Sequence, residues 1–144
     1  MALAAELGCA DAVTITGFVD DAEYRMWLAR ASCVVLLRQR AHGEGSAALA
    51  DAIGASRPVI TSLSTAAELP DGVVELVDPD VPVATLITKV RRMLVDPIHS
   101  GMLTRTAAAY ADSWRMEHVA TRVLEAALAA PRPSYPHPLV PVAP

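Results

Sequence analysis

Short runs of apolar residues, most of them β-branched, recur along the chain and predict strands. They occupy residues 13–16 (VTIT), 33–37 (CVVLL), 59–60 (VI) and 73–77 (VVELV). The second run has no polar alternation, which is typical of a strand covered on both faces in a parallel sheet. The third follows Arg57-Pro58, where proline ends the preceding helix because it lacks an N–H group. The chain therefore supplies four candidate strands.

Apolar residues at helical spacing separate and follow these strands. The first predicted helix covers residues 21–31, with Asp20 and Glu23 in the positions of a capping box. Its apolar face is expected to consist of Tyr24, Trp27, Leu28 and Ala31, which recur at helical spacing. Further helices are expected over 45–56, 83–94, 102–110 and 113–128. Asp96-Pro97 ends the helix over 83–94, and Ser113 is a candidate cap for the last one. That last helix is amphipathic, so we expect its apolar face to dock on the body of the protein.

The order of these elements, β-α-β-α-β-β-α-α, indicates an α/β protein with a mostly parallel sheet and helices on both faces. In such sheets ligands bind beyond the carboxyl ends of the strands, where loops meet helix N-termini. The loop over 38–46 lies at that place and is the first candidate for a binding site. Six of the 11 prolines fall within residues 131–144, so we expect a disordered, solvated tail after one domain over residues 1–130.

Composition and charge narrow the class of protein. The 144 residues are 53% hydrophobic and 4% aromatic, which suits one compact domain packed with small aliphatic side chains. A net charge of −4 argues against a nucleic-acid partner. Cys9 and Cys33 are isolated, which favours burial as small apolar side chains over a metal or redox site. Glu6 interrupts the N-terminal apolar stretch and no apolar run could span a membrane, so we expect a cytoplasmic protein, which could work near a membrane through a partner or a lipid-linked substrate.

The loop after the second strand carries the candidate site. His42, Gly43, Glu44, Gly45 and Ser46 precede a predicted helix, whose free N–H groups and dipole favour an anion. The two glycines let a ligand approach the backbone, so the segment is a candidate cradle for a diphosphate. The same spacing fits an ordinary strand-to-helix turn in which Ser46 caps the helix.

Charged residues on either side of this loop extend the candidate site. Arg38 and Arg40 leave the same strand end and could add positive charge, although surface solvation explains Arg40 equally well. Glu44 and Asp51 are seven residues apart, so a helix that begins near Glu44 would carry both carboxylates on one face. Asp51 lies in an otherwise apolar helix and must reach solvent, a basic partner or a polar ligand. The sequence contains no GxGxxG or P-loop motif, and its spacings indicate neither a metal cluster nor a nucleophile-base pair.

The succession of these motifs resembles the C-terminal domain of retaining glycosyltransferases of the GT-B fold, in the group called glycosyltransferase family 4. The similarity covers about residues 3–128 and runs in order through VTITGFVDDAEYRMWLARASCVVLL, HGEGSAALADAIGASRPVITS, AELPDGVVELVDPD, VRRMLVDP and DSWRMEHVATRVLEAAL. The resemblance implies a Rossmann-like domain that is incomplete at its N-terminus. The strand and basic loop that open this domain in the family have no counterpart here.

The resemblance also implies roles for individual residues. Pro58-Val59 matches the family's Gly-x-Pro-Val motif, and counting back from it places Asp51 on an acid that contacts the donor ribose. Gly43 occupies the place of the family's other acid and Glu44 follows it, as in a subgroup whose loop reads Gly-Glu-Ser/Thr-Ser-Gly. The loop amides and Glu44 would then face the diphosphate and the transferred sugar. The implied donor-binding set is Arg38, His42, Gly43, Glu44, Gly45, Ser46 and Asp51.

Two functions follow as hypotheses. The resemblance implies a retaining transferase that moves a hexose from a nucleoside diphosphate sugar to a saccharide or lipid-linked acceptor, with no metal ion or other cofactor. It assigns no catalytic residue to this chain, because transfer in the family takes place in the cleft against an N-terminal, acceptor-binding half. The alternative is a non-catalytic module from a truncated or split gene, which binds nucleotide or packs against a separately encoded half.

Overall fold

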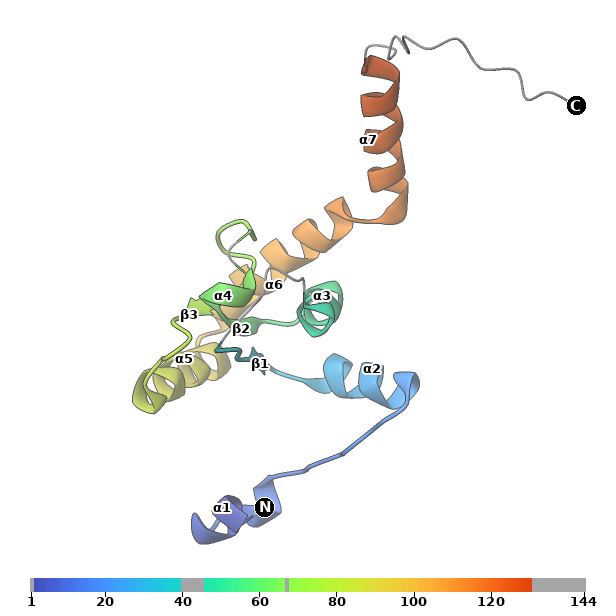
Figure 1. The fold of residues 1–144 in the computed structure, drawn as a ribbon. Helices are drawn as coiled ribbons and strands as arrows, with labels where there is room; N and C mark the ends of the chain where they lie inside the picture. The colour runs from blue at the N-terminus through green and yellow to red at the C-terminus, as the bar shows by residue number, and fades with distance from the viewer. Residues whose placement is uncertain (1, 40–45, 67, 131–144) are drawn as a thin grey trace, which may run out of the picture.

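A computed structural model describes residues 2–39, 46–66 and 68–130 of the chain. Three strands form a parallel sheet in the order β1-β2-β3: β1 (Val34–Leu36), β2 (Val59–Ser62) and β3 (Glu75–Val77). Every residue of the central strand β2 is buried. Short connections through helices return the chain to the same end of the sheet each time, as parallel strands require (Figure 1).

Helices flank this sheet and confirm the expected α/β, Rossmann-like fold (Figure 1). They are α1 (Ala2–Glu6), the 3-10 helix η1 (Ala10–Ala12), α2 (Asp21–Arg30), α3 (Ala47–Gly54), α4 (Leu63–Ala66), α5 (Val83–Val95), α6 (Pro97–Ser113) and α7 (Met116–Ala129). Among the described residues, no helix is both long and apolar enough to cross a membrane.

The core lies on both faces of β2, because successive residues of a strand point to opposite sides. Val59 belongs to a cluster with Leu49 and Ile53 of α3 and Ala107 of α6. The next residue, Ile60, belongs to a second cluster, which also contains Val77, Met93 and Leu103. The helices therefore cover both faces of the sheet, as the order of strands and helices predicted.

Local signals place several helix ends as expected. The side chain of Asp20 accepts a hydrogen bond from the backbone N–H of Glu23 at 2.9 Å, which starts α2 as a capped helix. Asp96 ends α5 and at the same time caps α6, whose first residue is Pro97. Helix α6 begins five residues earlier than position 102, because the Asp96 cap and the proline already satisfy the needs of a first turn.

Residues 13–16 do not form the predicted strand. They run extended but pair with no strand of the described chain, and Ile15 is 67% exposed. β-branched residues favour an extended backbone, but a strand also needs a hydrogen-bonded neighbour. Strand β1 differs too: it is an edge strand with Val35 41% exposed, so it is not covered on both faces. Cys9 is exposed in the same N-terminal segment, contrary to the expectation of burial.

The last helix also differs from expectation. None of its residues is buried, and Leu128 is 77% exposed, so in the described part of the chain its apolar face docks on nothing (Figure 1). Ser113 does not cap it; the Ser113 hydroxyl donates to the Tyr110 carbonyl at 2.6 Å, and α7 begins at Met116. The predicted tail over 131–144 lies outside the described residues.

Candidate functional site

The carboxyl ends of β1 and β2 hold the backbone of Arg38 in place. The Arg38 N–H donates to the Ser62 hydroxyl at 2.8 Å, and the Ser64 hydroxyl donates to the Arg38 carbonyl at 3.2 Å. One residue pair deeper, the Thr61 hydroxyl donates to the Leu36 carbonyl at 2.9 Å. These bonds fix the point at which the chain leaves the sheet, and the exposed Arg38 side chain starts from this edge as the sequence predicted.

Ser46 lies at the N-terminus of α3 and caps it. Its side chain accepts a hydrogen bond from the Leu49 N–H at 3.3 Å. This hydrogen bond fits the interpretation of the segment as a strand-to-helix turn capped by Ser46. Diphosphate binding by the preceding loop stays a prediction. Arg40, His42, Gly43, Glu44 and Gly45 lie outside the described residues. Helix α3 begins at Ala47, whereas the prediction that Glu44 and Asp51 share a helical face required a start near Glu44.

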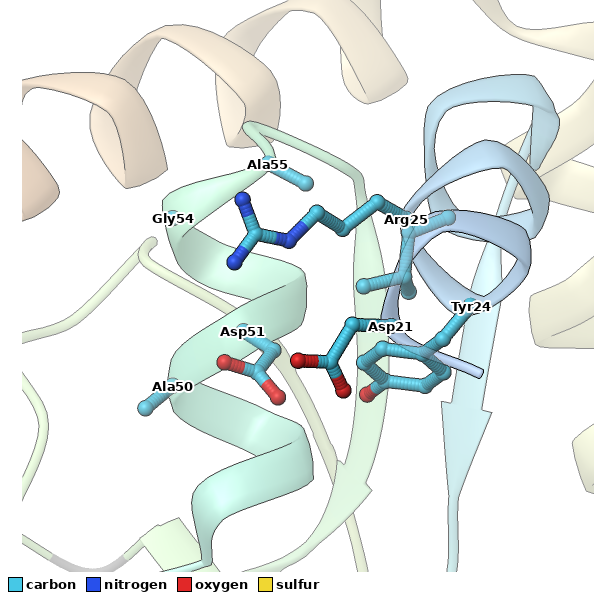
Figure 2. Close-up of a pocket in the computed structure, with 8 residues that line it drawn as sticks. Asp21, Tyr24, Arg25, Ala50, Asp51, Gly54 and Ala55 are labelled. Carbon is cyan, nitrogen blue, oxygen red and sulfur yellow. The ribbon is translucent and has the colours of Figure 1, made fainter. Parts of the chain in front are cut away.

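Asp51 lies on the exposed side of α3, where it lines a cavity of about 580 Å³ between α2 and α3. Its other polar walls come from three residues on one face of α2, namely Asp21, Tyr24 and Arg25. Figure 2 shows the two carboxylates and the Tyr24 hydroxyl gathered at one end, with the Arg25 side chain reaching across toward Gly54 and Ala55. The floor is formed by small residues of α3 and by Leu28.

The charges in this cavity are only partly compensated. Within the described residues, neither Asp21 nor Asp51 forms an ion pair with a basic side chain. The pKa of Tyr24 is raised above its ordinary value, first by burial and then by the charge and hydrogen bonding of the Asp51 carboxylate. Asp51 therefore reaches solvent, which is one of the three environments that its place in an apolar helix allows, and it interacts with the Tyr24 hydroxyl.

This arrangement suits a polar, hydroxyl-bearing ligand. Two carboxylates accept hydrogen bonds from hydroxyl groups, while the Arg25 guanidinium and the Tyr24 hydroxyl can donate them. Sequence reasoning missed the α2 side of the cavity, because it placed Tyr24 on the apolar face of that helix. Asp21, Tyr24 and Arg25 are spaced at i, i+3 and i+4, which puts them on one face of α2, and this spacing was the signal that could have found them.

A second group of charged side chains lies at the start of β3. The Glu75 carboxylate forms an ion pair with Lys89 of α5 and lies 3.2 Å from His99 Nε2 of α6. A cavity of about 240 Å³ adjoins Glu75 and His99. Because Glu75 is the first residue of its strand, this cluster lies at the end of the sheet opposite Arg38 and ties three elements together.

In the described part of the chain, three or more His, Cys, Asp or Glu side chains nowhere gather in a way that could hold a metal ion. The two acids of the α2–α3 cavity are a pair only. The expectation that no metal or cofactor is needed remains a prediction.

Comparison with known proteins gives a structural likeness. No protein-family model matches the chain. No curated protein matches it either. Among solved structures, a sucrose-phosphate synthase from Thermosynechococcus elongatus superposes with a TM-score of 0.67 at 20% sequence identity, over 88% of this chain and 33% of that one. The chain thus spans about a third of the length of that enzyme, and at this identity the match shows a shared fold.

Proposed function

We propose that this chain is the donor-binding part of a retaining glycosyltransferase of the GT-B fold and binds a nucleoside diphosphate sugar. The observation that carries the proposal is the position of Asp51. The sequence resemblance singled out this residue as the ligand of the donor ribose, and in the structure it lines the larger of the two cavities described, between α2 and α3. The shared fold with a sucrose-phosphate synthase supports the same assignment.

In this proposal the ribose hydroxyls lie in the α2–α3 cavity and bind the carboxylate of Asp51. A carboxylate can accept hydrogen bonds from both hydroxyls of a vicinal diol, so it orients the nucleoside as well as binding it. Arg25 and Tyr24 line the same cavity and can donate to further oxygens of the nucleoside. Asp21 lies opposite Asp51 and would favour hydroxyl donors over any anionic group at this end of the cavity.

The diphosphate would lie nearer the N-terminus of α3 and the exposed side chain of Arg38. Helix N-terminal amides and a guanidinium both favour negative charge, and they stabilise a leaving diphosphate as its charge develops. Glu44 and the loop before Ser46 would face the diphosphate and the transferred hexose. The chain then needs no metal ion for donor binding, because amides and arginine supply the compensation for the phosphate charge.

Transfer of the sugar requires a second part of the active site, which binds the acceptor. Rate enhancement in a two-substrate transfer comes largely from holding donor and acceptor in reacting geometry. We propose that an acceptor-binding part, joined to this chain or supplied separately, closes over the donor. The acceptor would be a saccharide or a lipid-linked saccharide.

Isothermal titration calorimetry with UDP, GDP and ADP, each added separately to the full chain, tests the proposal. We expect at least one to bind and Asp51→Ala to weaken its binding at least about tenfold, the loss of one or two hydrogen bonds to a charged group. Asp112→Asn is the matched control, because Asp112 is an exposed helical acid on α6 that should leave binding unchanged. If none of the three nucleotides binds, or if both variants bind as the parent does, the proposed site is wrong.

The alternative is a non-catalytic module that packs against a partner. It is favoured by the exposed apolar face of α7, which a purely monomeric protein would not need. Incubation of the chain with a donor nucleotide sugar that it binds, with release of the nucleoside diphosphate as the readout, separates the two. Release that Asp51→Ala abolishes supports the enzyme, whereas binding without release, even after an acceptor-binding part and an acceptor are added, supports the module.

A further inference from the structure

Residues 2–20 extend from the body of the protein rather than packing against it. Helix α1 contains no buried residue, and Figure 1 shows α1 and the extended segment that follows it lying apart from the sheet. Within this segment Ile15 is 67% exposed and Phe18 is 99% exposed. Residues 2–20, which we call the arm, thus present apolar side chains that the described part of the chain leaves uncovered.

Strand β1 provides an open edge of the sheet. Among the described strands it pairs with β2 alone. Val34 donates to the Pro58 carbonyl on the β2 side, and alternate residues of a parallel strand bond to the same neighbour, so the N–H and C=O of Val35 face the open side. The edge carries no proline or bulge, and Val35 is half-exposed. Such an edge is ready to accept another strand.

The arm contains the one segment of the described chain that is built as a strand but lacks a partner. Residues 13–16 are extended, β-branched and exposed. They are one residue longer than the three-residue strand β1, so they are long enough to pair along it. Yet the arm does not reach the β1 edge of its own chain (Figure 1). One chain therefore carries both an unpaired strand-like segment and an open strand edge. When two copies come together, the segment of each copy can pair with the edge of the other.

Charge favours the same pairing. Every charged residue of the arm is acidic, namely Glu6, Asp11 and Asp20, and two of them flank residues 13–16. The residues around β1 are basic, with Arg30 before the strand, Arg38 after it and no acid between them. Asp11 precedes residues 13–16 and Asp20 follows them. An acid therefore lies toward Arg30 and another toward Arg38 whether residues 13–16 run parallel or antiparallel to β1.

We propose that two copies of this chain form a symmetric dimer in which residues 13–16 of each copy add to the β1 edge of the other. The exchange pairs the open backbone groups of both segments and covers Ile15 and Val35 together. It also covers the exposed edge of β1, whose unpaired backbone groups would otherwise be open to pairing with other chains. The contact is isologous, so it closes at two copies.

The mass of the purified chain in solution, from sedimentation equilibrium, tests the dimer. We expect a dimer whose dissociation constant rises about tenfold or more in Ile15→Lys, because a symmetric dimer contains the substitution twice and lysine on an edge opposes strand addition. Ile98→Lys is the matched control, a similarly exposed isoleucine on α6 that should leave the constant unchanged. A monomeric parent chain overturns the proposal, as does a dimer that Leu128→Lys on α7 dissociates and Ile15→Lys does not.

Disulfide trapping tests which segments meet. In a background with Cys9→Ser and Cys33→Ala, the single variants Ile15→Cys and Val35→Cys are mixed and oxidised. The proposal predicts a disulfide-linked species of twice the chain mass in the mixture, well above the amount formed by either variant alone. A double variant that instead closes the bond within one chain shows that the arm returns to its own sheet, which overturns the exchange between copies.

Discussion

The contacts of Glu75 with Lys89 and His99 allow a quantitative test of how the sheet is held to its helices. Glu75→Ala removes the carboxylate that pairs with both Lys89 and His99. The side chains of Glu75 and His99 are 18% and 9% exposed, so the lost contacts lie largely out of solvent. The substitution therefore separates β3 from two helices at once and leaves an imidazole without its acceptor.

The expected loss follows from this burial. An exposed ion pair contributes about 0–1 kcal/mol, whereas removing one partner of a fully buried pair costs about 3–5 kcal/mol. The Glu75 cluster lies between these limits, because Lys89 keeps some contact with water and can be solvated after the substitution. We expect Glu75→Ala to lower the free energy of unfolding by about 2–3 kcal/mol.

Urea denaturation, followed by far-ultraviolet circular dichroism, measures this change. Glu117→Ala is the control, because Glu117 pairs with Arg115 on the exposed surface of α7 and its removal should cost less than about 0.5 kcal/mol. A loss for Glu75→Ala as small as that of the control would refute the view that this cluster ties β3 to α5 and α6.

Three further predictions concern single residues. The pKa of Asp96 is lowered, chiefly by the hydrogen bond from the His99 N–H. The contribution of Asp96 to stability is therefore full above the ordinary pKa of 3.8 and is lost as pH falls through the lowered value. Asp96→Asn, which still caps α6, should show a flatter loss of stability in acid titrations. Because the pKa of Tyr24 is raised, the contribution of Tyr24 to stability is present below pH 10.0 and is lost as pH rises through the raised value. Asp51→Asn should shift the ionisation of Tyr24 back to lower pH, which absorbance measures with Tyr24→Phe as the reference. Ser46→Ala removes the cap of α3 and should lower the free energy of unfolding by about 1 kcal/mol in urea titrations, whereas Ser46→Asp should retain most of it.

Sequence reasoning succeeded where the deciding contacts are local. Asp20 and Asp96 cap helices through hydrogen bonds to backbone groups two or three residues away, so the residues that define each helix end are neighbours in the sequence. The parallel sheet was predictable for a related reason: continuous apolar runs alternating with helices have few other ways to bury both faces. The candidate position of Asp51 came from its spacing to Pro58-Val59, and the structure adds the cavity that it lines.

Other features depend on contacts between distant residues. The walls of the α2–α3 cavity come from helices about 30 residues apart, and the Glu75–His99 pair joins positions 24 residues apart in the sequence. No local pattern specifies which helix faces will meet, because that is settled by how the layers pack around β2. For the same reason Tyr24 could be read as an apolar contact when it lies in a polar cavity.

The sequence by itself determined where α2 starts and where α5 ends, that the strands run parallel, and that residues 13–16 and the last helix carry apolar side chains. Only the tertiary structure decided that those apolar residues stay uncovered in the described chain, with Ile15 extended but unpaired and Leu128 exposed on α7. Backbone preference acts within a few residues, whereas a strand needs a neighbour and an amphipathic helix needs a surface. Those partners are set by the fold and, on our proposal for the arm, by a second copy of the chain.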